Sequence, residues 1–138
     1  MTTTACILRD IAVRTVTVIG VHLGLSWFVG LLDTSGGANI GAGLLTFVLL
    51  MVLSGLGGLI DGRRVGVLST VVIWVATAVL VAVAMIATFD PWPPDSGVVV
   101  SDLWEIGPFL TSLVAVPALI GGLLTGLRRT APEAHTGR

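Results

Sequence analysis

The 138-residue chain has few of the residues that a soluble protein places at its surface. Charged residues make up 11% of it and hydrophobic residues 54%, and the mean hydropathy is +1.03. A soluble domain of this size would have too little polar surface to cover itself. The scarcity of charge therefore predicts that lipid is the solvent, and that residues 1–129 form a single membrane domain.

Residues that carry chemistry are equally scarce. Cys6 is the only cysteine, so no internal disulfide can form. The sequence has no Cys/His spacing typical of a metal site, no phosphate-binding loop and no nucleophile beside a base. We therefore expect that the protein is not an enzyme and uses no metal or cofactor. The net charge of −1 and the small groups of Arg give no basis for nucleic-acid binding.

Four long runs without charge are present, each of at least 18 residues: 15–32, 34–60, 65–89 and 106–127. A hydrocarbon core of about 30 Å needs roughly 20 apolar residues in a helix. The runs are continuous in Leu, Val, Ile, Ala and Gly, which favours helices over the alternating strands of a barrel. We expect an all-α, polytopic four-helix bundle with spans at about 11–32, 40–60, 65–89 and 104–127.

Basic and acidic residues fall on opposite sides of these spans. The seven basic residues, all Arg, lie before the first span, between the second and third, and after the fourth. The other two loops hold five of the eight acidic residues: Asp33, Asp90, Asp95, Asp102 and Glu105. The positive-inside rule then places the chain in the cell membrane with both termini in the cytoplasm, and 130–138 as a disordered cytoplasmic tail.

The connections between spans predict local structure. The segment 61–64, Asp-Gly-Arg-Arg, predicts a tight loop between two neighbouring antiparallel helices, with Asp61 in a turn or capping role at the water boundary. The segment 90–101 holds three prolines, which predict an irregular cap. Ser101 or Asp102 is then the expected N-cap of the fourth spanning helix, ahead of its membrane portion.

Small residues recur every four positions in the expected helices. They are Gly20 and Gly24 in the first helix, and Ala118, Gly122 and Gly126 in the fourth. Such stripes allow two helix backbones to approach closely, which stabilises helix pairs in lipid. The stripe in the fourth helix fits contact with the second helix or with a second subunit, and the sequence leaves both open.

Two helix ends also resemble each other in sequence. The segment 57–64 is similar to 121–129, about 64 residues further along the chain, with Gly, Leu and paired Arg in corresponding places. Two parallel hairpin repeats would produce this likeness. Similar composition at two cytoplasmic helix ends would produce it as well.

His22 is the one ionisable residue expected well inside a span. It shares a helix face with Ser26, four residues further on. Thr15, seven residues before His22, and Asp33, seven residues after Ser26, lie on the same face. Polar groups inside a membrane are costly and often functional, so His22 and Ser26 are the candidate substrate or proton path. The alternative is a packing role, in which a neutral His22 hydrogen-bonds to Ser26 or to a neighbouring backbone.

Two segments of the chain resemble known proteins. The first is 58–63, Gly-Leu-Ile-Asp-Gly-Arg, and the second is 109–126, which contains Thr111, Pro117 and a Gly-rich end. In these segments and in topology the chain resembles small bacterial four-transmembrane proteins classed as drug/metabolite-transporter-like. This resemblance implies a small-molecule transporter that works as an oligomer. The related small multidrug exporters carry a Glu in helix one, where this chain has His22, so their site is not carried over.

A different class of function fits the same pattern. In this alternative the chain is a non-transporting structural or accessory subunit, which binds another membrane protein through its small-residue helix faces. The expected partners are therefore the lipid bilayer and either further copies of the chain or another membrane protein.

Overall fold

The computed structural model describes residues 3–32, 40–89 and 96–130, and the regular structure within these ranges is all α-helical. Four helices are long and apolar enough to cross a membrane, which confirms the expected all-α bundle of four spans. Asp33 and the expected tail from residue 131 lie outside the described residues. The helices are α1 (Thr3–Leu32), α2 (Ile40–Arg64), α3 (Val67–Phe89), α4 (Ser96–Glu105) and α5 (Gly107–Thr130).

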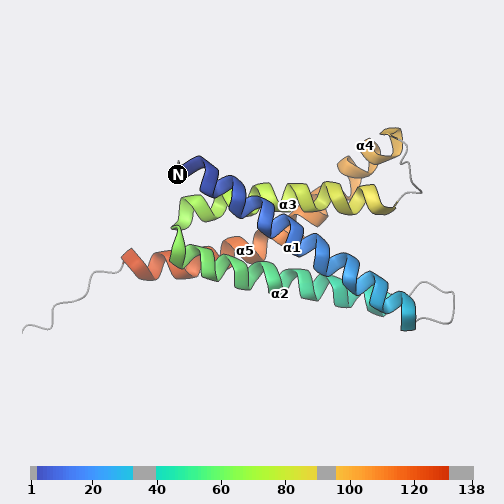
Figure 1. Ribbon diagram of the computed structural model, residues 1–138, viewed down its shortest axis with the longest axis horizontal. Helices are drawn as coiled ribbons and strands as arrows, with labels where there is room; N and C mark the ends of the chain where they lie inside the picture. The colour runs from blue at the N-terminus through green and yellow to red at the C-terminus, as the bar shows by residue number, and fades with distance from the viewer. Residues whose placement is uncertain (1–2, 33–39, 90–95, 131–138) are drawn as a thin grey trace, which may run out of the picture.

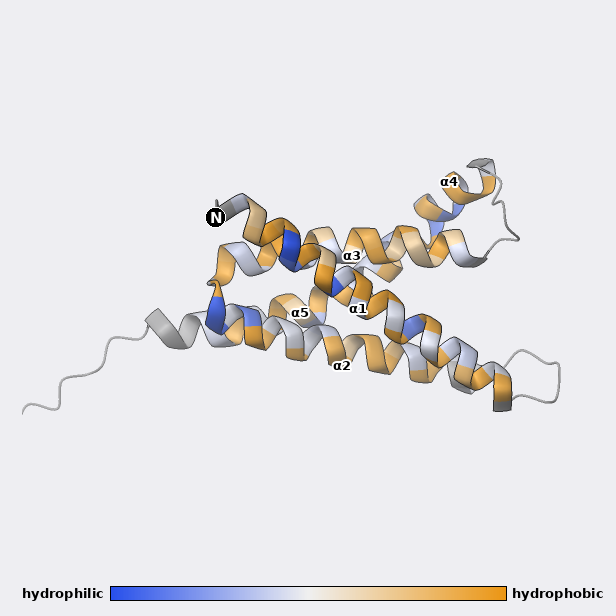
Figure 2. Ribbon diagram, in the orientation of Figure 1, coloured by the Kyte–Doolittle hydropathy of each residue, from blue (hydrophilic) through white to orange (hydrophobic). Residues whose placement is uncertain are grey.

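The long helices lie side by side along one axis. The start of α1, the link from α2 to α3 and the end of α5 all lie at one end of the molecule (Figure 1). We call this the basic end, because Arg9, Arg14, Arg63 and Arg64 belong to it. Figure 2 shows that hydrophobic residues surround the rest of the long helices, as expected for helices that face lipid.

The closest packing in the bundle is between α2 and α5, which run in the same direction (Figure 1). A Cβ atom added to Gly58 of α2 would overlap the backbone carbonyl of Ala118 in α5. A Cβ added to Gly121 would lie 2.9 Å from the backbone nitrogen of Leu59. Glycine is therefore what allows these two backbones to touch.

The helix α3 covers a second side of α5. A Cβ added to Gly122 would lie 2.7 Å from Cγ2 of Thr70, and one added to Gly126 would overlap Val67. The small residues Ala118, Gly122 and Gly126 thus lie against α2 and α3 of the same chain. Together α2, α3 and α5 form a core in which Leu50, Ile73, Ile86 and Val114 are fully buried.

The helix α1 is peripheral to this core. In its most apolar stretch 6% of residues are buried, compared with 50% in α3 and 44% in α5. It packs mainly on α3, less on α2, and not on α5 over the described residues. Gly20 and Gly24 are exposed, and a Cβ added to either would meet nothing within 4 Å. These two glycines therefore make no close helix contact within the described chain.

The link between α2 and α3 differs from the sequence prediction. The segment 61–64 is the last turn of α2 and not a loop, so the turn role expected for Asp61 is wrong. The link itself is Val65 and Gly66, and the Val65 N–H still donates to the Asp61 carbonyl at 2.8 Å. Gly66 has φ +85°, a conformation that other residues rarely adopt, and this ends the helix.

The segment after the third span also differs from the prediction. Residues 96–105 form the separate helix α4, where an irregular cap was expected, and Ser101 and Asp102 lie inside it instead of capping the fourth span. Pro108 has no N–H with which to continue the hydrogen bonds of α4, but it is well suited to the first turn of a helix. The spanning helix α5 therefore begins at Gly107, after a break at Ile106, and not at residue 104.

A leucine at position 58 tests the contact between α2 and α5. We expect Gly58→Leu to lower the free energy of unfolding by about 1–3 kcal/mol, because the new side chain overlaps a backbone that cannot move aside. Gly43→Leu, on the same helix and with nothing within 4 Å of the added Cβ, is the matched control and should leave stability unchanged. Unfolding in mixed detergent, followed by circular dichroism, measures both. Equal stability of the two variants would contradict the packing.

Candidate functional site

A buried ion pair joins α1 to the end of α2. Nε of Arg14 donates to Oδ2 of Asp61 at 2.7 Å, and Nη2 of Arg14 donates to Oδ1 of the same carboxylate. The Asp61 side chain is 1% exposed and that of Arg14 is 17% exposed. This is the two-pronged geometry that arginine adopts with carboxylates. It connects two helices through residues 47 positions apart in the sequence.

Trp74 of α3 completes this polar cluster. Its indole Nε1 donates to Oδ2 of Asp61 at 2.7 Å, and its ring centre lies 6.0 Å from the guanidinium carbon of Arg14. The distance is at the outer limit of a cation–π contact. A Cβ added to Gly57 would overlap the indole ring, so the absence of a side chain at position 57 makes room for it. Helices α1, α2 and α3 therefore meet at Asp61.

The cluster satisfies the carboxylate more fully than the guanidinium. The oxygens of Asp61 accept three hydrogen bonds, two from Arg14 and one from Trp74. Nη1 of Arg14 donates to the backbone carbonyl of Asp10 at 3.1 Å. Moving an ion out of water costs several kcal/mol, which these bonds must offset. A pair of this kind is a poor way to gain stability, so its presence within a span points to a function.

A cavity of about 250 Å³ opens beside the ion pair, between α1 and α2. Arg14, Asp61 and Trp74 line one end of it. Its remaining wall includes the apolar side chains Val13, Val18, Leu53 and Ile60, with Thr17. Leu53 and Asp61 are eight residues apart, so this wall extends about 12 Å along α2. We call this space the α1–α2 cleft.

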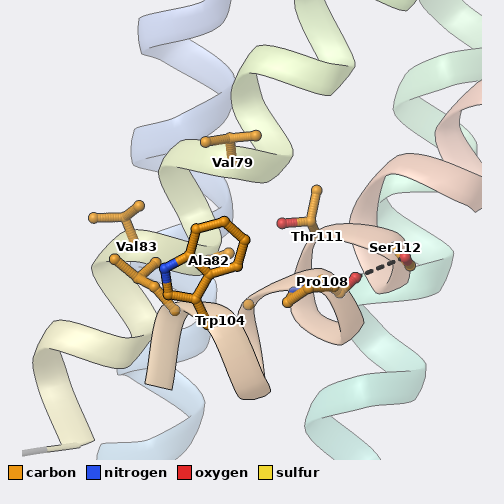
Figure 3. A pocket seen from close by; sticks show the side chains of 9 residues that line it. Val79, Ala82, Val83, Trp104, Pro108, Thr111 and Ser112 are labelled. Carbon is orange, nitrogen blue, oxygen red and sulfur yellow. Dashed lines mark hydrogen bonds between the residues drawn. The ribbon is translucent and has the colours of Figure 1, made fainter. Parts of the chain in front are cut away.

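A second cavity, of about 820 Å³, lies toward the opposite end of the bundle between α3, α4 and α5. Figure 3 shows the Trp104 ring beside Ala82 and Val83, with Thr111 and Ser112 on the facing helix. The Ser112 hydroxyl donates to the Pro108 carbonyl at 2.7 Å. None of the nine residues that line this cavity is ionisable. The α1–α2 cleft, which brings opposite charges together, is therefore the candidate functional site.

The sequence-predicted path residues lie elsewhere on α1. The Ser26 hydroxyl donates to the backbone carbonyl of His22 at 2.9 Å, so Ser26 does not bond to the imidazole. Nδ1 of His22 is buried without a hydrogen-bond partner among the described residues, as is Oγ1 of Thr15. Neither His22 nor Ser26 lines the α1–α2 cleft.

Sequence reasoning assigned Arg14 to orientation and Asp61 to a turn, and so missed their pairing. One signal in the sequence was available. Most acidic residues lie on the side opposite to the Arg groups, whereas Asp61 lies only two residues before Arg63. A carboxylate on the side where topology favours arginine calls for a specific partner. Which arginine it contacts depends on how α1 is rotated, and this is known only from the fold.

No family model, curated protein or solved structure matches this chain. The choice of the ion pair and its cleft as the candidate functional site therefore depends on their geometry.

A double-mutant cycle tests the ion pair. We expect Arg14→Gln to lower the free energy of unfolding by about 3–5 kcal/mol, because it leaves the Asp61 carboxylate buried without its partner. Adding Asp61→Asn should recover part of this loss, since no unpaired charge then remains. Unfolding in mixed detergent measures the coupling between the two positions.

Arg9→Gln is the control for this cycle. The Arg9 side chain is 55% exposed and lies 3.4 Å from Oδ1 of Asp10, so its loss should cost less than about 1 kcal/mol. Additive effects of Arg14→Gln and Asp61→Asn would show that the two residues do not interact.

Proposed function

We propose that the chain is a subunit of an oligomeric small-molecule transporter of drug/metabolite-transporter-like type. The observation that carries the proposal is the ion pair of Arg14 and Asp61 at one end of an otherwise apolar cleft. Ionisable groups within membrane spans are rare and mark substrate or ion pathways. The cleft offers a bound molecule both charge and apolar surface, as small-molecule sites do.

The moving element in this proposal is α1. It has the least buried surface of the four spans, whereas α2, α3 and α5 share a tightly packed core. Elements with few buried contacts are those that open most easily. When the ion pair separates, α1 is free to tilt away from α2 and widen the cleft. His22 and Ser26, the path residues expected from the sequence, lie further along α1 and outside the cleft.

The proposal requires more than one copy of the chain. The cleft of about 250 Å³ is smaller than the range of about 300–1,000 Å³ that is usual for ligand pockets. Gly20 and Gly24 of α1 are exposed, and a Cβ added to either would meet nothing within 4 Å, so this face of α1 is open. A second copy packed there encloses the path that one copy leaves open.

The alternative function is an accessory subunit that binds another membrane protein. The same exposed Gly20 and Gly24 favour it, because small residues on an unoccupied helix face suit close contact with a partner helix. The small residues of α5 do not serve this purpose, since they already contact α2 and α3. In this alternative the ion pair only holds α1 in place.

Subunit number distinguishes the two functions. We expect native mass measurements of the purified protein in mild detergent to give an oligomer of identical chains, and Gly24→Leu to weaken it by blocking close approach of α1. Gly43→Leu is the matched control, because Gly43 is also exposed without close neighbours. A strict monomer would overturn the transporter, and stable co-purification with a different membrane protein would favour the accessory role.

In the proposed orientation the chain spans a bacterial inner membrane with both termini in the cytoplasm. Cys6 allows a direct test of this orientation. Because Cys6 is the only cysteine, a membrane-impermeant maleimide should label intact spheroplasts poorly and permeabilised ones well. The variant Cys6→Ser with Ser101→Cys moves the thiol to α4 and should be labelled in both. Labelling of Cys6 in intact spheroplasts would reverse the orientation.

A further inference from the structure

Over the described part of the chain, the hydrogen-bonding groups of the α1–α2 cleft that remain without a partner are mainly N–H donors. A guanidinium has five N–H donors, and Arg14 uses three of them, two toward Asp61 and one toward the Asp10 carbonyl. Two donors remain. The Asp61 carboxylate is already bonded by Arg14 and Trp74, and the Thr17 hydroxyl donates to the Val13 carbonyl at 2.8 Å. Among the described residues, the cleft thus has more to offer an acceptor than a donor.

The charge around the cleft acts in the same direction. Arg63 and Arg64 are exposed and follow Asp61 in the last turn of α2. Arg9 is largely exposed on α1, and Asp10 beside it is mostly buried. The last turn of α2 thus adds two exposed guanidinium groups close to Asp61 in the sequence, while the Arg9 guanidinium is paired with Asp10. Such a cluster attracts anions and disfavours cations over about a Debye length.

The rest of the cleft selects for an apolar body. Val13, Val18, Leu53 and Ile60 line it, and the wall extends about 12 Å from Asp61 toward the membrane interior. A fully polar anion would leave this surface unused. A molecule with an acidic head and an apolar chain covers the wall while its head remains at the membrane boundary.

We propose that the α1–α2 cleft binds an anionic amphiphile, with its carboxylate or phosphate on the two free N–H groups of Arg14 and its apolar chain between α1 and α2. Binding of the amphiphile does not require the proposed function. Only its role as the transported substrate rests on that function. A free fatty carboxylate and an anionic lipid share the required chemistry.

The binding experiment uses the full chain in nanodiscs of neutral phosphatidylcholine. Replacing Trp27, Trp92 and Trp104 with Phe leaves Trp74, in contact with Asp61, as the only fluorophore. Titration with decanoate, below its micellar concentration, should give a saturable change in Trp74 fluorescence. Decylammonium has the same chain and the opposite charge, and it should bind at least about tenfold more weakly.

Variants of α2 test where the chain of the ligand lies. Leu53→Phe fills the cleft and should weaken decanoate binding at least about tenfold, while it leaves the ion pair intact. Leu44→Phe is the matched control, because Leu44 is 64% exposed and lies nine residues before Leu53, on the opposite face of the same helix, and it should bind as the parent does. Circular dichroism confirms that both variants are folded.

Three results would overturn the proposal. They are equal binding of decanoate and decylammonium, no effect of Leu53→Phe, and disulfide crosslinking of Leu53→Cys between two copies, which would show that a second chain fills the cleft. Co-purification of an anionic lipid that decanoate displaces would support it and identify lipid as the source. A monomer that binds decanoate would overturn the transporter function but leave the binding site in place.

Discussion

Direct contact between the backbones of α2 and α5 is the constraint on which the rest of the bundle depends. Lipid supplies no hydrophobic force that would drive helices together, so their association relies on close van der Waals packing. Gly58 and Gly121 allow this approach, and no larger residue fits at either position. Because α3 also packs on α5, one helix organises the core. The likeness between segments 57–64 and 121–129 falls on the two helices in contact.

A different interaction attaches α1. It has little buried surface, and its polar tie to α2 is the charge pair between Arg14 and Asp61. Dispersion contacts between packed helices contain no group that a ligand can replace, whereas a paired ion can exchange its partner for another group of suitable charge. A ligand can thus compete for Arg14 but has no comparable means of separating α2 from α5. The bundle therefore combines a fixed core of α2, α3 and α5 with a helix, α1, whose position depends on whether Arg14 is paired with Asp61 or with a ligand.

The spans were predictable because membrane helices need little more than length and freedom from charge, as in 65–89. The helix α4 was missed because the three prolines before it suggested irregular backbone throughout, while Ser96–Glu105 contains none. The candidate site was not predictable for another reason. Arg14 and Asp61 are 47 residues apart, and their meeting depends on the rotation of α1 about its axis. Charge patterning contains no information on rotation.

The order of synthesis gives the ion pair one more consequence. The ribosome completes α1 before it has made Asp61, and α5, which organises the core, is made last. Until α2 is complete, Arg14 lacks the carboxylate with which it pairs. A chain truncated after α1 would therefore hold an arginine that only water or lipid headgroups could satisfy.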